Sequence, residues 1–210
     1  MLFRSGPELC VSATKSFLSQ LGIFYLLSFS MVNSFDKAIR DLKKISGEVV
    51  KAIDWNNEGL KELSEKLKGV HDFYYIARGI NFATASEGAL KLKEISYIHA
   101  EGMPAGELKH GTLALIEPGT PVVVVCPGDD TFRETLNNAV EAKSRGAFII
   151  ALSDEENDIY DFWIKIPKVD NLYYPVINAV PLQLLAYHMA VSRGCDPDRP
   201  RNLAKSVTVK

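Results

Sequence analysis

The sequence has little of several features that define specialised protein classes. Only three of its 210 residues are cysteine, and Cys10, Cys126 and Cys195 are too scattered for a disulfide framework or a cysteine metal site. We therefore expect a reducing, cytoplasmic setting and no bound metal. Charge of one sign is not in excess either, because 24 basic and 26 acidic residues leave a net charge of −2. This balance offers no general attraction to nucleic acid or to an anionic membrane.

Long hydrophobic runs and phosphate-binding glycine motifs are also missing. The apolar segment Leu21 to Val32 is about twelve residues long, shorter than the roughly twenty that a membrane span needs, and predicts a buried helix. Glu8, Lys15 and Gln20 interrupt the N-terminal region, so a signal peptide is not expected. The motifs G-x-G-x-x-G and G-x-x-x-x-G-K-[ST] do not occur, so no nucleotide cofactor is expected and the cofactor prediction is none.

The first sixty residues are predicted to be helical. Apolar residues recur at helical spacing from Ser12 to about Asn33, and Ser34 can cap a second helix that runs to about Ile53. A third, amphipathic helix is expected over Glu58 to Lys68. No strand accompanies these helices, so the segment resembles the end of a larger unit.

After Gly69 the pattern changes to alternating strands and helices. Strands that read as apolar runs between helices indicate a parallel sheet with helices on both faces, so the fold class is α/β. Ligands of such sheets bind beyond the carboxyl ends of the strands, here the loops after Ala77 and Cys126. We divide the chain into residues 1–60, 61–192 and 193–210. The expected strands are 73–77, 121–126, 148–152 and 162–166, and the expected helices are 84–98, 130–145 and 181–191.

One face of the helix predicted over 84–98 carries three charged residues. Glu87, Lys91 and Glu94 are spaced at i, i+4 and i+7, which puts one lysine between two carboxylates. The pattern is typical of a solvated ion-pair stripe, which is the more common meaning of such spacing. The alternative is a carboxylate base that the lysine orients.

Two further segments could carry chemistry. His99 and His110 lie in a glycine-bounded stretch, and their spacing does not suit a metal site. His110 could serve as an acid or base, although a structural role is equally compatible with the pattern. In the C-terminal tail, Lys205 could act as an amine nucleophile if the tail is held over a site, whereas most polar termini simply fray.

Three segments resemble one known family. EGALKLKEISYIHAEGMPAGELKHGTLALI (87–116), VPLQLLAYHMA (180–190) and PRNLAKSVTV (200–209) are similar to the C-terminal isomerase part of the glucosamine-6-phosphate synthases, the isomerising glutamine–fructose-6-phosphate aminotransferases. ELCVSATKSF (8–17) resembles the end of the first sugar-isomerase (SIS) domain of that family, and residues 73–191 resemble the second. The chain departs from the family at Ser12-Ala13, where Ala-Ser is usual.

The resemblance implies a SIS-type fold and a sugar-isomerase site in a homodimer. Lys205 would form a Schiff base with the ketose, and Glu94 would move the proton between C1 and C2. Lys91 would orient the sugar and Glu94, while His110 would assist ring opening from the neighbouring subunit. The sugar pocket would also be lined by Val11, Ala204 and Glu87.

The family resemblance implies missing parts as well. The glutaminase domain and most of the first SIS domain, with its phosphate-binding loops, have no counterpart in these residues, so glutamine hydrolysis is not expected. The expected function is conversion of fructose 6-phosphate to glucosamine 6-phosphate, with the missing parts in the same chain or another. The alternative is a non-catalytic SIS module that binds a phosphosugar or supports dimerisation.

Overall fold

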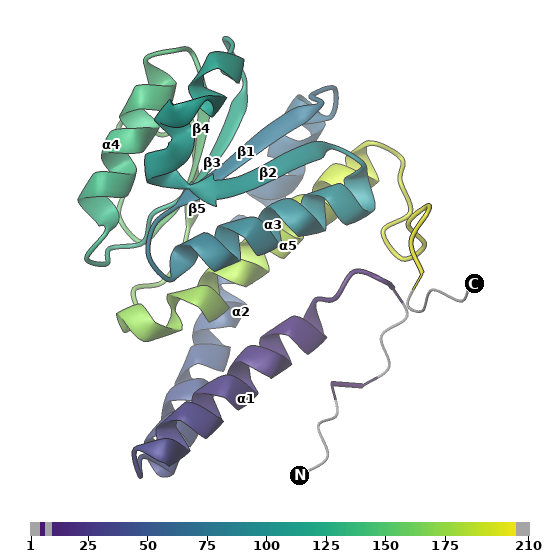
Figure 1. The fold of residues 1–210 in the computed structure, drawn as a ribbon. Helices are drawn as coiled ribbons and strands as arrows, with labels where there is room; N and C mark the ends of the chain where they lie inside the picture. The colour runs from purple at the N-terminus through teal and green to yellow at the C-terminus, as the bar shows by residue number, and fades with distance from the viewer. Residues whose placement is uncertain (1–4, 7–9, 205–210) are drawn as a thin grey trace.

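The computed structural model describes residues 5–6 and 10–204, and the described chain forms a five-stranded parallel sheet with helices on both faces (Figure 1). The strand order is β2-β1-β3-β4-β5. The predicted α/β class is confirmed. In chain order the elements are α1 (Lys15–Met31), α2 (Phe35–Leu67), β1 (Asp72–Ala77), α3 (Asn81–Ser96), β2 (His99–Pro104), η1 (Ala105–His110), η2 (Thr112–Leu115), β3 (Pro121–Val125), α4 (Phe132–Lys143), β4 (Phe148–Ser153), β5 (Phe162–Lys165), η3 (Asn171–Tyr173) and α5 (Tyr174–Ser192).

Two apolar cores lie on the two faces of the sheet. Helices α2, α3 and α5 cover one face, where α5 packs against both of the others. Helix α4 and the short η1 helix lie on the opposite face. Strands β1, β3 and β4 are buried almost completely, as expected of parallel strands that are covered on both sides.

The two helices predicted over 34–53 and 58–68 are one continuous helix, α2. The prediction of a break was wrong because Asn56 has tertiary partners that a sequence pattern does not reveal. Its side-chain amide donates to Lys165 O at 2.7 Å, and its Oδ1 accepts from Lys165 N at 3.0 Å. Asn56 thus pairs with the backbone of edge strand β5 and covers that edge. Helix α2 runs through residue 60, where the sequence analysis divides the chain. The division itself remains a prediction.

Strand β2 was not predicted, because its sequence HAEGMP is poor in β-forming residues. Backbone pairing with β1 forms it, with Gly102 opposite Tyr75. Gly102 permits a close approach to α3, since a Cβ there would lie 2.6 Å from Ser86 Cα. Helix α5 also begins earlier than predicted and contains Pro181, and close packing on nearly all sides offsets the cost of an internal proline.

Helix α1 and the first half of α2 project away from the sheet (Figure 1). Leu21, Tyr25 and two further apolar residues of α1 pack against the core. The prediction that the apolar segment 21–32 forms a buried helix was wrong, because only this one side of α1 meets the core and none of its residues is fully buried. The opposite side stays exposed, with Phe24 63%, Leu27 57% and Met31 85% accessible. No helix among the described residues has the length and hydropathy to span a bilayer.

Candidate active site at the end of helix α3

The charged stripe of α3 is buried rather than solvated. Lys91 is only 3% exposed, although lysine is rarely found so deep without partners. Its Nζ lies 2.8 Å from Glu94 Oε2 and 3.3 Å from Glu87 Oε1. The two carboxylate side chains keep 17% and 15% exposure. The cluster therefore holds one net negative charge in a largely desolvated position, which the solvated-stripe alternative does not explain.

The N-terminal segment supplies a further donor to this cluster. The hydroxyl of Ser12 donates to Glu94 Oε2 at 2.7 Å, although the two residues are 82 positions apart. Cys10 anchors the segment, because its Sγ accepts from Ser12 N at 3.2 Å and donates to Pro197 O at 2.9 Å. Val11 lies between these two contacts. This predicted pocket residue is therefore placed beside the end of α3.

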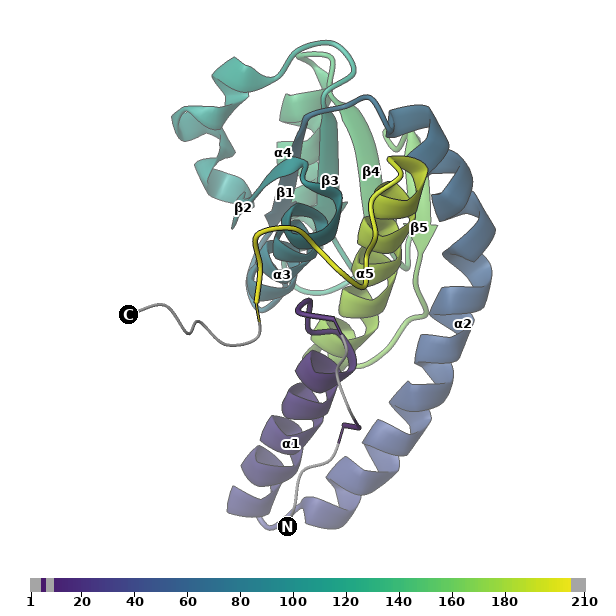
Figure 2. The same cartoon turned by 90° about the vertical axis from the view of Figure 1, so that its right-hand side faces the viewer.

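The C-terminal tail reaches the same end of α3 (Figure 2). Tyr97 ends the helix in a left-handed conformation, with φ of 61°. Its hydroxyl accepts a hydrogen bond from Arg201 N at 2.8 Å, and the Arg201 guanidinium lies 4.2 Å from its ring centre. The described tail continues to the exposed residue Ala204. Lys205, the predicted nucleophile, lies outside the described residues.

Burial raises the pKa of one carboxyl group in the cluster, that of Glu87. Desolvation raises the pKa of Glu87, and this effect outweighs the opposing influence of the Lys91 ammonium and its hydrogen bond. The nearby charge of Glu94 raises the pKa of Glu87 further. Two carboxylates that share one lysine thus differ in environment, a feature common to sites where carboxylates exchange protons.

The cluster does not lie at the carboxyl ends of the strands, where the sequence analysis expects the ligand to bind. Helix α3 begins directly after the carboxyl end of β1 and runs back along the sheet, so Glu94 in its last turn lies near the amino ends. That part of the prediction was wrong because it followed the general rule for open α/β sheets. The N-terminal segment, rather than a strand loop, contacts the charged residues through Ser12.

The crevice at the carboxyl ends has the wrong charge for a phosphate. It has a volume of about 520 Å³ and is lined by acidic residues from the loops after β2 and β3, including Glu107, Asp130 and Glu134. The one basic side chain in its lining, Arg78, donates to Asn138 Oδ1 at 2.9 and 3.2 Å. An anionic ligand would meet net repulsion here.

His110 ends η1 and is exposed. It follows β2, which runs from the Glu94 end of α3 back to the carboxyl edge of the sheet. Helix η1 packs in the core on the face of the sheet opposite to α3, so His110 and Glu94 of one chain lie on opposite sides of the sheet. The structure therefore does not bring His110 to the cluster within this chain.

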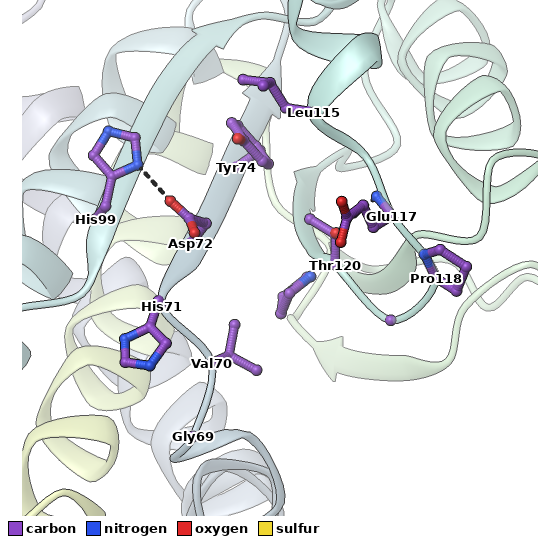
Figure 3. A pocket seen from close by; sticks show the side chains of 12 residues that line it. Gly69, Val70, His71, Asp72, Tyr74, His99, Leu115, Glu117, Pro118 and Thr120 are labelled. Atoms are coloured by element: carbon purple, nitrogen blue, oxygen red, sulfur yellow. Dashed lines mark hydrogen bonds and ion pairs between the residues drawn. The ribbon is translucent and has the colours of Figure 1, made fainter.

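A different hollow lies at the amino ends of β1 and β3 (Figure 3). It has a volume of about 540 Å³ and contains the pair formed by His99 Nδ1 and Asp72 Oδ1, 2.9 Å apart. These side chains are 61% and 57% exposed. An exposed pair of this kind contributes little energy and leaves its groups freely hydrated. None of the predicted site residues lines this hollow.

Comparison with known proteins identifies the family. The model of the SIS domain matches residues 66–193, from the end of α2 to the end of α5. The chain belongs to the SIS domain family. The match contains the whole sheet and α3, and therefore the Glu87, Lys91 and Glu94 cluster.

The most similar relatives carry one activity in their names. Isomerising glutamine–fructose-6-phosphate aminotransferases of Thermococcus kodakarensis and Pyrococcus horikoshii are 52% and 48% identical to this chain, each over 98% of it. The chain spans only 36% and 35% of those proteins. The solved C-terminal domain of the Francisella tularensis aminotransferase has a TM-score of 0.84 and 36% identity, and the match covers 92% of this chain and 58% of that structure.

Sequence reasoning missed the contact of Ser12 with the cluster and the contact of Tyr97 with the C-terminal tail. The departure at Ser12-Ala13 was a signal for the first, because it shifts a hydroxyl by one position beside the site. Tyr97 gave no signal, since an aromatic residue at the end of an amphipathic helix usually belongs to the core. Only the course of the tail reveals its contact with Arg201.

Proposed function

We propose that this chain carries out the isomerase chemistry of an isomerising glutamine–fructose-6-phosphate aminotransferase. The observation that carries the proposal is the buried Lys91, which holds Glu87 and Glu94 together, with Glu94 in contact with the N-terminal segment through Ser12. A carboxylate fixed beside an ammonium group can remove a carbon-bound proton and return it to the neighbouring carbon. The 52% identity to the Thermococcus kodakarensis aminotransferase supports the same reaction.

The proposed roles divide the reaction among four side chains. The amine of Lys205 condenses with the C2 carbonyl of fructose 6-phosphate and releases water. Glu94 moves a proton from C1 to C2, and Lys91 orients this carboxylate and the sugar. His110 assists ring opening. Val11, Ala204 and Glu87 line the sugar pocket in this proposal.

The positions of these residues support a homodimer. His110 ends η1, which packs on the face of the sheet opposite to α3 and Glu94, so it would act on the site of a second copy. The acidic crevice at the carboxyl ends is unsuited to a phosphate, so the sugar phosphate would be held by another SIS unit. Ammonia would come from a glutaminase unit. We place the protein in the cytoplasm, where its three free thiols would persist.

Solvent exchange tests the proposal directly. The chain, alone and joined to the preceding SIS unit of a relative, is incubated with fructose 6-phosphate in D₂O, and deuterium at C1 is followed by NMR. Glu94→Gln should abolish the exchange, whereas Glu101→Gln, which changes an exposed carboxylate of β2, should preserve it. Exchange that persists in Glu94→Gln would refute the assignment.

Borohydride reduction tests the Schiff base. After reduction in the presence of fructose 6-phosphate, mass spectrometry should locate a hexose phosphate adduct on Lys205. An adduct on Lys91 or Lys109 would overturn the role of Lys205. The absence of any adduct with the joined protein would favour a non-catalytic function.

The exposed apolar side of α1 favours a second candidate, a SIS module that binds a phosphosugar or holds copies together. This side exposes three large apolar side chains to solvent, those of Phe24, Leu27 and Met31, which is unfavourable unless another surface covers them. Sedimentation of the wild type and of Leu27→Glu would test this candidate. A dimer that the substitution converts to monomer would support association through α1, and an unchanged sedimentation coefficient would exclude it.

A further inference from the structure

Ser12 makes a contact with the proposed catalytic carboxylate that the reaction scheme does not use. Its side chain is buried, at 6% exposure, and its hydroxyl donates to Glu94 Oε2 at 2.7 Å. We propose that Ser12 is a positioning residue that, together with Lys91, holds Oε2 of Glu94 so that Oε1 carries the transferred proton. This inference rests on the proposed function, because it assigns the roles of the two oxygens of Glu94 in that reaction.

Both donors meet the same oxygen of Glu94. Lys91 Nζ is 2.8 Å from Oε2 and Ser12 Oγ is 2.7 Å from it, so the two lone-pair sites of this oxygen are occupied. Within residues 5–6 and 10–204, no hydrogen bond to Oε1 of Glu94 is found. The side chain keeps 17% exposure. Oε1 is therefore the oxygen available to accept a proton from a sugar carbon.

Ser12 also distinguishes the two carboxylates that share Lys91. Glu94 receives two short hydrogen bonds, whereas Glu87 has the lysine at 3.3 Å. A charged carboxylate that accepts two bonds is held in one rotamer, and such fixation lowers the entropy cost of reaching the reactive geometry. Ser12 thereby favours Glu94 rather than Glu87 as the group that moves the proton.

The hydroxyl of Ser12 is itself held in place. The Ser12 backbone amide donates to Cys10 Sγ, and that thiol donates to Pro197 O in the C-terminal tail. Helix α1 begins three residues later, at Lys15. The position of the hydroxyl relative to α3 is thus fixed by both ends of the chain and does not depend on a single rotamer.

NMR of the resting protein tests the contact without substrate. In protein labelled with ¹³Cδ-glutamate, the Glu94 and Glu87 resonances are assigned with Glu94→Gln and Glu87→Gln. Ser12→Ala should shift the Glu94 resonance and leave that of Glu87 within its linewidth. The matched control Ser28→Ala, at an exposed serine of α1, should move neither. An unchanged Glu94 resonance in a folded Ser12→Ala variant would overturn the proposal.

The deuterium exchange assay tests the positioning role. Misplacement of a reacting group by about 1 Å can cost about a hundredfold in rate, so Ser12→Ala should lower the maximal exchange rate at least about tenfold. The half-saturating fructose 6-phosphate concentration should stay within about twofold of wild type. A raised half-saturating concentration with an unchanged maximal rate would refute positioning, because it would mean that Ser12 acts on sugar binding.

The NMR and deuterium exchange experiments distinguish a failure of the proposed function from a failure of the proposed role of Ser12. If the joined wild-type protein shows no exchange, the proposed function fails and the catalytic role of Ser12 fails with it, whatever the NMR result. If wild type exchanges and Glu94→Gln does not, the proposed function stands, and a normal maximal rate in Ser12→Ala would refute the role of Ser12 alone.

Discussion

Replacing Lys91 with methionine should destabilise the protein far more than the loss of an ordinary surface ion pair. Lys91 is 3% exposed and contacts Glu87 and Glu94, whose side chains are 15% and 17% exposed. Methionine fills a similar volume but leaves both carboxylates without their cation. Breaking a buried ion pair in this way costs about 3–5 kcal/mol. We expect the lower end, about 3 kcal/mol, because Ser12 still donates to Glu94 and both acids retain some contact with water.

Urea denaturation followed by far-ultraviolet circular dichroism measures this effect. With a slope of about 2 kcal/mol per molar urea, a loss of about 3 kcal/mol lowers the unfolding midpoint by about 1.5 M. The matched control is Lys68→Met, which removes a pair with Glu65 at 3.1 Å in which both side chains are more than half exposed. That control should cost no more than about 0.5 kcal/mol.

A second substitution identifies the cause of the loss. Burial raises the pKa of Glu87 above its ordinary value and Lys91 opposes that shift, so the Lys91→Met deficit should shrink as the pH falls and Glu87 takes up a proton in the folded state. Adding Glu87→Gln to Lys91→Met should recover about 1 kcal/mol at pH 7. If Lys91→Met lies within 1 kcal/mol of Lys68→Met, the cluster is a solvated stripe and the argument for a desolvated site fails.

Three further predictions concern packing, pH and reactivity. Gly88→Ala should destabilise the protein by about 1–3 kcal/mol, because the new Cβ would lie 2.8 Å from a Leu182 carbon. Gly47 has open space around it, so the control Gly47→Ala should stabilise the protein by about 0.5–1 kcal/mol in the same urea assay. Burial lowers the pKa of His188, so below pH 6.5 the unfolded state binds more protons than the folded state. The free energy of unfolding should therefore fall as the pH drops through 6.5, by at most about 1.4 kcal/mol per pH unit. The variant His188→Gln should flatten that dependence. Iodoacetamide should label the other two cysteines of the folded protein but not Cys126, whose thiol has a pKa raised to about 12 by burial.

The sequence predicted those elements whose stability is local or whose burial is continuous. The runs that became β1, β3 and β4 are apolar throughout, and burial on both faces leaves no other arrangement for them. The start of the helix predicted over 84–98 was wrong, because α3 begins three residues earlier, at Asn81. Asn81 donates to Asp129 Oδ2 at 2.7 Å across the loop after β3, a contact that no local pattern contains.

In the candidate site too, helical spacing predicted the local arrangement, and contacts with residues far along the sequence could not be predicted. Helical spacing predicted that Glu87, Lys91 and Glu94 share a face, and the structure places them together. Spacing alone favoured a solvated stripe, because it does not reveal contacts with distant segments, such as the one that Ser12 makes with Glu94 from 82 residues away. The role of His110 could not be tested within one chain, since its proposed partner site belongs to a second copy.

The three charged residues of the cluster stand on one firmly packed helix. Glu87, Lys91 and Glu94 stand on α3, which packs along the sheet and against α5 and is among the most extensively buried helices of the domain. A helix so fixed holds charged groups in one geometry, as acid–base chemistry requires. A further contact to the cluster comes instead from a short irregular segment before α1, where the Ser12 hydroxyl donates to Glu94. The relative positions of the three charged residues are therefore set by α3 itself, and the hydrogen bond from Ser12 is added to that fixed arrangement.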